Sequence, residues 1–145
     1  ELDANREFYA RMEPIRIKAG RRMGLGDVTK SVTPKFGLVA PARHGGHFSV
    51  RYFMPWNCHP TLAVTGSQCL ASCALTPGSI ADGIMEIPVS PATVTIEHPM
   101  GEMDVTMTFE RDGYRGVTIQ AAGLVRTARL LARGEVFVPS SVWSR

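Results

Sequence analysis

Apolar residues near the start of the chain recur at the spacing of a helix. Within residues 3–23 they stand at Phe8, Met12, Ile15, Ala19 and Met23. This repeat predicts a helix with Asp3 as its N-cap and residues 23–27 (MGLGD) as its stop. Pro14 lacks a backbone donor and disfavours helix at the residue before it. We therefore expect either a kink there or a second helix that begins at Pro14.

From residue 34 onward, short runs alternate apolar and polar positions, which is the period of a β-strand. The predicted strands span 34–42, 47–55, 92–99, 102–110 and 114–122, with a short final strand at 135–139. Residues 43–46 are the expected turn between the first two strands. Met100-Gly101 is expected to join the next two in a hairpin.

One segment between these strands is apolar nearly all round. Residues 64–75 read VTGSQCLASCAL, which is typical of a buried central helix, and Thr76-Pro77-Gly78-Ser79 closes it. The chain has 145 residues, enough for one domain with a core and short for two. The sequence therefore predicts an α+β domain in which a strand-rich layer wraps one apolar helix.

Composition and charge narrow the classes of function. The chain is 44% hydrophobic and 20% charged, as in ordinary globular proteins, and its net charge is +3. Its longest basic run is Arg21-Arg22 and its aromatic residues do not alternate with basic ones, so we expect no nucleic-acid partner. No apolar run reaches the roughly 18 residues of a membrane span. Three cysteines show no disulfide framework, which favours a reducing cytoplasm.

Residues 57–69 (NCHPTLAVTGSQC) hold the densest group of candidate metal ligands. Cys69 and Cys73 share a helix face at i, i+4, and Cys58-His59 lies upstream. Zinc sites bring ligands in close pairs, with a second pair at a defined spacing, whereas the pair here lies among Leu, Ala and Ser. We therefore interpret Cys69 as a small hydrophobic residue of the core and expect no metal.

The same stretch contains a candidate thiol nucleophile. Such a thiol needs a neighbouring base or a helix N-terminus. Cys58 precedes His59, but neighbours on an extended segment point to opposite faces, which favours a packing or rim role for Cys58. No G-x-S-x-G motif is present, so serine-hydrolase chemistry has no support.

Thr65, Gly66 and Ser67 open the apolar helix and suit an anion. The first turn of a helix has unpaired N–H groups and the positive end of the helix dipole. Gly66 would let a carboxylate approach the backbone, while Thr65 and Ser67 can add hydroxyl donors. The alternative is that Thr65 or Ser67 only N-caps the helix, and the residues leave both interpretations open.

Three segments resemble the PrpF family, which includes oxalomesaconate tautomerase and related isomerases of unsaturated polycarboxylic acids such as methylitaconate and aconitate. They are RIKAGRRMGLGDVTKSVTPKFGLVAP (16–41), RYFMPWNCHPTLAVTGSQCLASCALTPGS (51–79) and RTARLLARGEVFVP (126–139). Their most specific motif is H-P-x-x-x-V-T-G at 59–66. The resemblance implies a diaminopimelate-epimerase-like fold, in which each of two domains is a curved, mixed or antiparallel sheet around a central helix. It also implies that His59, Thr65, Gly66 and Ser67 bind substrate carboxylates in the cleft between the domains.

Family members are about twice this length, so the resemblance implies that residues 1–145 form one domain, the C-terminal half. The family's catalytic lysine and cysteine lie in the other half, and no catalytic residue is assigned here. In this fold the terminal strand often crosses to the N-terminal domain, so we expect 135–139 to belong there. The expected partners are a polycarboxylate substrate, the N-terminal domain and a second copy in a homodimer, with no cofactor.

Two departures from the epimerases of this fold bear on the reaction. Diaminopimelate epimerases have a catalytic cysteine in a T-L-A-C-G-T-G context, and TLAVTGS (61–67) has Val64 at that position. Pro55-Trp56 stands where they have an amine-binding Glu-Arg pair. We therefore expect a substrate with carboxylates and no ammonium group, isomerised by a 1,3-allylic proton shift. The alternatives are a non-catalytic accessory protein that binds a polycarboxylate, and a cofactor-independent racemase or epimerase. This chain alone is expected to be inactive.

Overall fold

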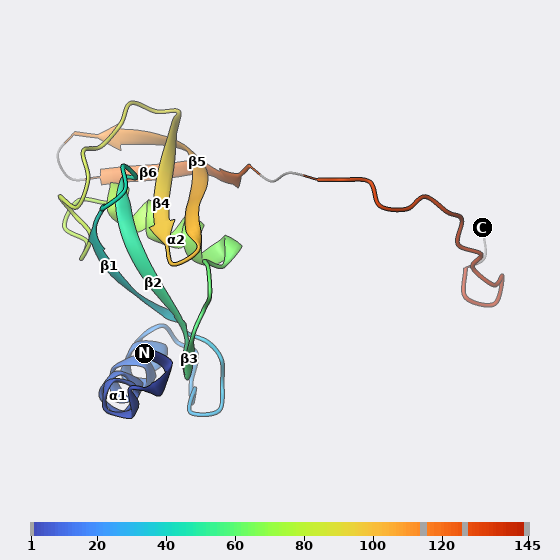
Figure 1. Ribbon diagram of the computed structural model, residues 1–145, viewed down its shortest axis with the longest axis horizontal. Helices are drawn as coiled ribbons and strands as arrows, with labels where there is room; N and C mark the ends of the chain where they lie inside the picture. The colour runs from blue at the N-terminus through green and yellow to red at the C-terminus, as the bar shows by residue number, and fades with distance from the viewer. Residues whose placement is uncertain (1, 114–115, 126–127, 144–145) are drawn as a thin grey trace.

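A curved sheet with one helix packed against it makes up most of the molecule (Figure 1). The computed structural model describes residues 2–113, 116–125 and 128–143. Helix α2 (Val64–Leu75) lies behind the sheet in this view, and helix α1 (Arg6–Arg22) lies beyond its lower end. No helix in the described ranges is long and apolar enough to cross a membrane.

Helix α1 follows a 3-10 turn, η1 (Leu2–Ala4). Its N-cap is Asn5, whose side chain accepts a hydrogen bond from a first-turn N–H at 3.0 Å, so the prediction of Asp3 as N-cap is wrong. Asp3 lies in the preceding turn, where its carboxylate accepts hydrogen bonds from the Tyr9 hydroxyl and the Cys58 N–H. Those contacts tie the N-terminus to the sheet instead of capping the helix.

The predicted stop of α1 is confirmed. The helix ends at Arg22, and Gly24 and Gly26 follow with φ angles of 76° and 70°. Glycine adopts this left-handed conformation without steric cost, which is why it commonly ends helices. The helix is continuous through Pro14, so the alternative of a second helix that begins there is wrong.

The strands form one mixed, six-stranded sheet. They are β1 (Phe36–Pro41), β2 (Phe48–Met54), β3 (Asn57–Cys58), β4 (Ala92–His98), β5 (Gly101–Asp112) and β6 (Gly116–Leu124). The order is β1-β2-β4-β5-β6, and β3 pairs with β2. Only β2 and β4 are parallel among the described pairs, because α2 connects them. Both predicted hairpins are confirmed, and the first two residues of the predicted strand 114–122 lie outside the described residues.

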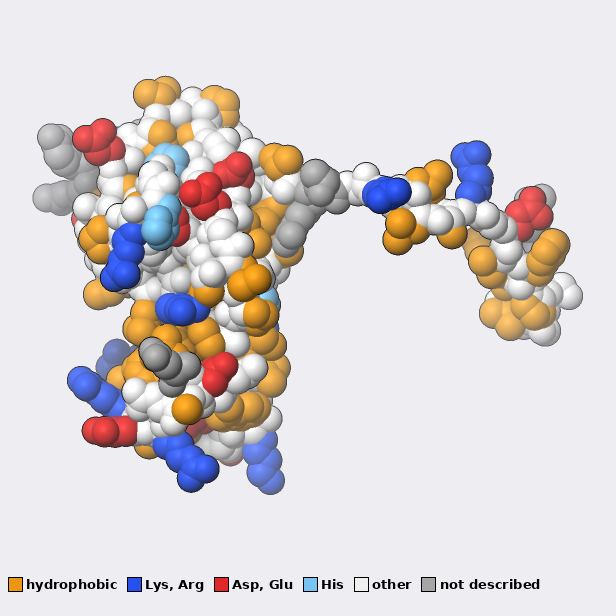
Figure 2. Space-filling model, viewed as in Figure 1, with side chains coloured by type: hydrophobic (Ala, Val, Ile, Leu, Met, Phe, Trp, Pro, Cys, Tyr) orange, Lys and Arg blue, Asp and Glu red, His pale blue; other side chains and the backbone are white. Residues whose placement is uncertain are grey.

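Residues 135–139 form no strand in this chain, contrary to the prediction. The segment 128–143 runs away from the sheet, and Figure 2 shows apolar side chains along it. Leu131 is 87% exposed and Phe137 is 89% exposed. A strand needs a neighbouring strand for its backbone hydrogen bonds, so an apolar run without one stays irregular. The assignment of 135–139 to another domain stays a prediction.

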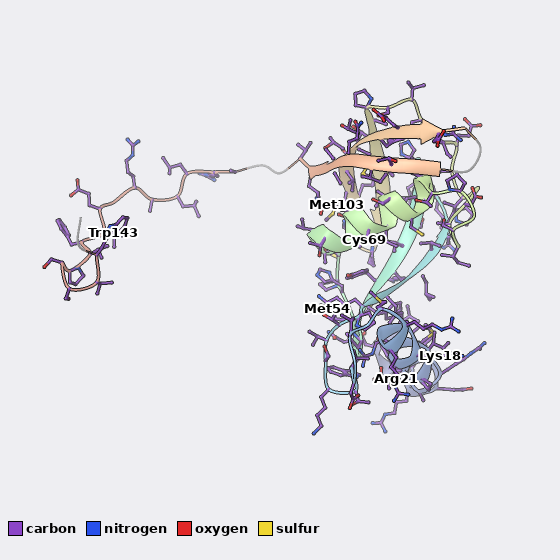
Figure 3. The ribbon with its side chains drawn as sticks, turned by 180° about the vertical axis from the view of Figure 1, so that it is seen from behind. Lys18, Arg21, Met54, Cys69, Met103 and Trp143 are labelled. Carbon is purple, nitrogen blue, oxygen red and sulfur yellow. The ribbon has the colours of Figure 1, made fainter. Side chains whose placement is uncertain are left out.

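Helix α2 packs against one face of the sheet and confirms the predicted fold class. The core between the two layers is formed by buried side chains of both, among them Phe48, Val50, Ala71, Ala74, Leu75, Val94, Ile96, Val105 and Met107. The sheet covers only one side of the helix. Cys69 is exposed on the other side, so its predicted place in the core is wrong (Figure 3).

A buried guanidinium, that of Arg16, orders the loop after α1. Arg16 is 2% exposed and forms a two-point ion pair with Glu13, each contact 2.7 Å long. It also donates to the carbonyl oxygens of Val28 at 2.8 Å and Ser31 at 3.0 Å. Beside it, a Cβ on Gly20 would lie 2.6 Å from the Val28 side chain. The planar fork of arginine donors can reach a carboxylate and several carbonyls at once, which lysine cannot do.

Replacing Arg16 with methionine tests this role. The substitution keeps an apolar stem but leaves the loop carbonyls and the Glu13 carboxylate without their donor. We expect the free energy of unfolding, measured with urea, to fall by about 3 kcal/mol. Lys18→Met on the exposed side of the same helix (Figure 3) is the control and should change it by less than about 0.5 kcal/mol. Equal effects of the two substitutions would show that Arg16 does not order the loop.

Candidate functional site

The N-terminus of α2 has no side-chain cap. Its N-cap is Ala63, in an extended conformation with φ −72° and ψ 145°. The first N–H of the helix to find an acceptor is that of Ser67, which donates to the Ala63 carbonyl at 2.8 Å. The N–H groups of Val64, Thr65 and Gly66 therefore have no acceptor among the described residues. The positive end of the helix dipole lies at the same place.

The two hydroxyls of this turn differ in what they offer. The Ser67 hydroxyl donates to the Val64 carbonyl at 2.7 Å, and its side chain is fully buried. Thr65 is exposed, so its hydroxyl is open to a ligand. Neither residue is the N-cap, and the interpretation of this stretch as a cap alone is wrong.

The missing side chain of Gly66 makes room for Tyr52 of β2. A Cβ at position 66 would lie 2.6 Å from Tyr52 Cζ and 2.7 Å from its hydroxyl oxygen. The space beside Gly66 is therefore filled by the tyrosine, whereas the sequence suggested that it admits a ligand. Burial raises the pKa of the Tyr52 hydroxyl above its ordinary value of 10.0, so this group is a hydrogen-bond donor at neutral pH.

His59 lies on the segment between β3 and α2. Its N–H donates to the Tyr52 carbonyl at 2.7 Å, and its ring centre lies 6.1 Å from that of Tyr52 in an edge-on arrangement. The Thr61 N–H donates to His59 Nδ1 at 3.1 Å, so Nε2 carries the proton of the neutral ring. Tyr52 thus contacts both His59 and Gly66, although the sequence did not single it out.

A cavity of about 370 Å³ lies beside this segment. It is lined by Thr61, His98, Glu102, Met103, Asp104 and Val125. Burial lowers the pKa of His98, and the nearby His59 adds to this shift because two imidazolium cations would repel. The Met100 N–H donates to His98 Nδ1 at 3.2 Å, so this ring also keeps its proton on Nε2. The His98 ring, favoured in its neutral form, therefore lines this cavity near His59.

The cysteines belong to no metal cluster, and Cys58 is not an activated thiol. In the described part of the chain, no group of three or more His, Cys, Asp or Glu side chains is placed to hold a metal ion. Cys58 is half-buried, and burial raises the pKa of its thiol, which disfavours the reactive thiolate. The structure therefore gives Cys58 a packing environment at the edge of the sheet.

A second cavity, of about 400 Å³, lies on the other face of the sheet and contains a caged carboxylate. Histidine, arginine and acidic side chains gather over β1, β2 and β4 on this face (Figure 2). Glu97 is 4% exposed and accepts hydrogen bonds from the Ser49 hydroxyl and from the N–H groups of Arg43, His44 and Gly46. These bonds, with that of Ser49 the strongest influence, lower the pKa of Glu97 to about 2. Glu97 therefore holds the turn between β1 and β2.

The low pKa of Glu97 predicts the acid stability of the fold. Its ordinary pKa is 4.5, so the carboxylate stabilises the folded chain above that pH, and the stabilisation is lost as the pH falls toward 2. We expect urea unfolding of the wild-type chain to show this loss, and Glu97→Gln to show a flatter pH dependence. Glu102→Gln, directly opposite on β5 and exposed, should keep the wild-type profile. If the wild type and Glu97→Gln showed the same dependence of stability on pH, the hydrogen bonds to Glu97 would not stabilise the fold.

The fold identifies the class of protein to which this chain belongs. The crystal structure of methylitaconate-delta-isomerase matches this structure with a TM-score of 0.66 and 23% sequence identity. The match covers 85% of this chain and 38% of that one. The chain thus has the diaminopimelate-epimerase-like fold that the family resemblance implied. It belongs to the PrpF family, since the family model described as PrpF protein matches residues 1–139.

Relatives at higher identity are named as isomerases. The chain is 44% identical over 138 residues to (4E)-oxalomesaconate Delta-isomerase of a Novosphingobium species, a match that covers 94% of this chain and 38% of that protein. It is 38% identical over 143 residues to 4-oxalomesaconate tautomerase of Pseudomonas putida, covering 98% of this chain and 38% of that protein. The chain therefore spans about two-fifths of the length of the curated relatives it matches.

Proposed function

We propose that this chain is the carboxylate-binding half of an isomerase that shifts a C=C bond in an unsaturated di- or tricarboxylic acid. The observation that carries the proposal is the uncapped start of α2, where three backbone N–H groups find no acceptor among the described residues. A helix terminus of this kind binds carboxylates through its N–H groups and its dipole. The names of the relatives support the choice of acid, because they specify oxalomesaconate and 3-methylitaconate.

The residues indicated by the sequence take distinct roles in this proposal. The N–H groups of Val64, Thr65 and Gly66 hold one carboxylate of the substrate, and the Thr65 hydroxyl is a further donor. His59 presents its Nε2–H from the preceding segment. Ser67 acts indirectly, because its hydrogen bond to the Val64 carbonyl fixes the first turn. All four predicted residues thus serve one carboxylate site, with no metal or organic cofactor among its components.

The proposed reaction is a 1,3-allylic proton shift. A base takes a proton from a carbon next to a carboxylate or keto group, and an acid returns one at the far end of the allylic system. Negative charge in the enolate-like intermediate moves onto carboxylate oxygens. The N–H groups of α2 are already oriented to receive that charge, so they would stabilise the intermediate more than the substrate. The base and the acid come from the rest of the longer protein.

Two other functions would use the same site. An accessory protein would bind the polycarboxylate at α2 and exchange none of its protons. A racemase of this fold would need an acid–base thiol in the first turn of α2. Val64 occupies that position and is 46% exposed, which favours the isomerase over the racemase.

Deuterium exchange separates these functions. The complete protein that contains this chain is incubated in D₂O with 3-methylitaconate or 4-oxalomesaconate and followed by proton NMR. Double-bond migration with deuterium entering the carbon that gains hydrogen is the expected result. Ligand binding without exchange would identify the accessory protein, and exchange at a stereocentre without migration would identify the racemase. This chain alone is expected to bind without exchange.

A proline at position 64 tests the helix terminus itself. Val64 is the first residue of α2, where proline is tolerated, and Ala63 already has the extended conformation that proline favours in the residue before it. Val64→Pro removes one N–H and keeps the helix, so we expect kcat/KM of the complete protein to fall by about 10²–10³. Val64→Ala keeps the N–H and should retain wild-type activity. Equal activity of the two variants would exclude a role for this terminus.

We also infer that the C-terminal segment packs on the rest of the longer protein. The large apolar residues Leu130, Leu131, Val136 and Phe137 are all exposed in this chain. An apolar run of this kind indicates a missing partner surface, and the relatives are long enough to supply one. The partners in the proposal are therefore the polycarboxylate, this further domain and a second copy of the complete protein.

The three free cysteines are compatible with a cytoplasmic setting.

Deleting residues 128–145 tests the role of the segment. In this chain the free energy of unfolding should change by less than about 0.5 kcal/mol, because the segment buries little surface here. In the complete protein the same deletion should lower the midpoint of thermal unfolding, since docked apolar surface would be lost. The pair Leu131→Ser and Phe137→Ser should reproduce that loss at full length. An unchanged midpoint in the complete protein would contradict the docking.

A further inference from the structure

We infer that the Tyr52 hydroxyl is a further hydrogen-bond donor to the carboxylate held at the start of α2, an inference that rests on the proposed function. Tyr52 lies on the face of β2 that packs against the helix and is 8% exposed. Its hydroxyl has no hydrogen-bond partner in the described ranges of the chain. No fully buried side-chain oxygen there lacks a partner, so this hydroxyl must keep contact with solvent.

The hydroxyl is placed at the open helix terminus by Gly66. Its oxygen lies 2.7 Å from the position that a Gly66 Cβ would take, and Gly66 is the third residue of α2. The Gly66 N–H is one of the three that find no acceptor among the described residues.

A carboxylate explains both unpaired features at once. In the described part of this chain the Tyr52 hydroxyl and the first helix N–H groups have only water as a partner, and a carboxylate can replace that water with charge-assisted hydrogen bonds. A carboxylate accepts at both oxygens, so it can take hydrogen bonds from the helix N–H groups and from the phenol together. A ligand without that charge would form weaker bonds to both. Tyr52 would thus add to the selectivity of the site for an ionised carboxyl group.

The substitution Tyr52→Phe isolates the hydroxyl, because it keeps the ring that packs against Gly66. The ¹⁵N-labelled chain is titrated with tricarballylate, a saturated tricarboxylate, and the amide signals of residues 64–66 are followed by NMR. We expect the variant to bind roughly tenfold more weakly, with its α2 signals unchanged before ligand is added. Tyr9→Phe removes a phenol of helix α1 that donates to Asp3, and this variant should bind like the wild type.

The outcomes separate this inference from the function on which it rests. Equal affinities of the wild type and Tyr52→Phe would overturn the role of the hydroxyl and leave the proposed function standing. No tricarballylate-dependent shift at residues 64–66 of the wild type would overturn both. A second measurement needs no substitution: with ¹³Cζ-labelled tyrosine, the ligand should shift the Tyr52 signal and leave that of Tyr9 in place. A Tyr52 signal that does not move would overturn the inference.

Discussion

The close contact between Gly66 of α2 and the Tyr52 ring of β2 sets the arrangement of the rest of the domain. Without a side chain at position 66, the first turn of the helix approaches the sheet to within contact of an aromatic ring. Of the buried residues that follow, Ser67, Ala71 and Ala74 are also small, and Leu75 at the end of the helix is the large one. The sheet supplies the bulk of the core instead, through side chains such as Phe48 and Met107. Mostly small residues on the helix therefore pack against large ones on the sheet.

The same helix leaves its first N–H groups unpaired, at a cost in stability. A Ser, Thr, Asp or Asn at the N-cap contributes about 1 kcal/mol over alanine. Helix α1 has such a cap in Asn5, whereas α2 has Ala63. A capping carboxylate at position 63 would occupy the donors that a substrate carboxylate needs. The difference between the two helices is therefore what we expect if α1 is structural and the start of α2 is a binding site.

Two loops of this turn-rich chain are ordered by single buried charges of opposite sign. Arg16 donates to backbone carbonyls of the loop after α1, and Glu97 accepts from backbone N–H groups of the turn between β1 and β2. In both cases a charged side chain replaces the regular hydrogen bonds that a loop lacks, and such bonds are stronger than those between neutral groups. Neither Arg16 nor Glu97 belongs to the hydrophobic core between α2 and the sheet.

Apolar alternation predicted β1, β2, β4, β5, β6 and both hairpins, because it depends only on neighbours along the chain, and the all-round apolar run predicted α2. The alternation missed the two-residue β3, and it predicted a strand at 135–139 that this chain does not form. The motif H-P-x-x-x-V-T-G at 59–66, with Ser67 after it, indicated where the candidate carboxylate site lies.

Tertiary structure alone decided the other features. Asn5 caps α1 because Asp3 is bound to Tyr9 and Cys58, and Cys69 is exposed because the sheet covers one side of its helix. Glu97 and Tyr52 are polar residues on ordinary alternating strands. Their importance comes from partners distant in sequence, such as Arg43, 54 residues before Glu97, and only folding brings those partners together.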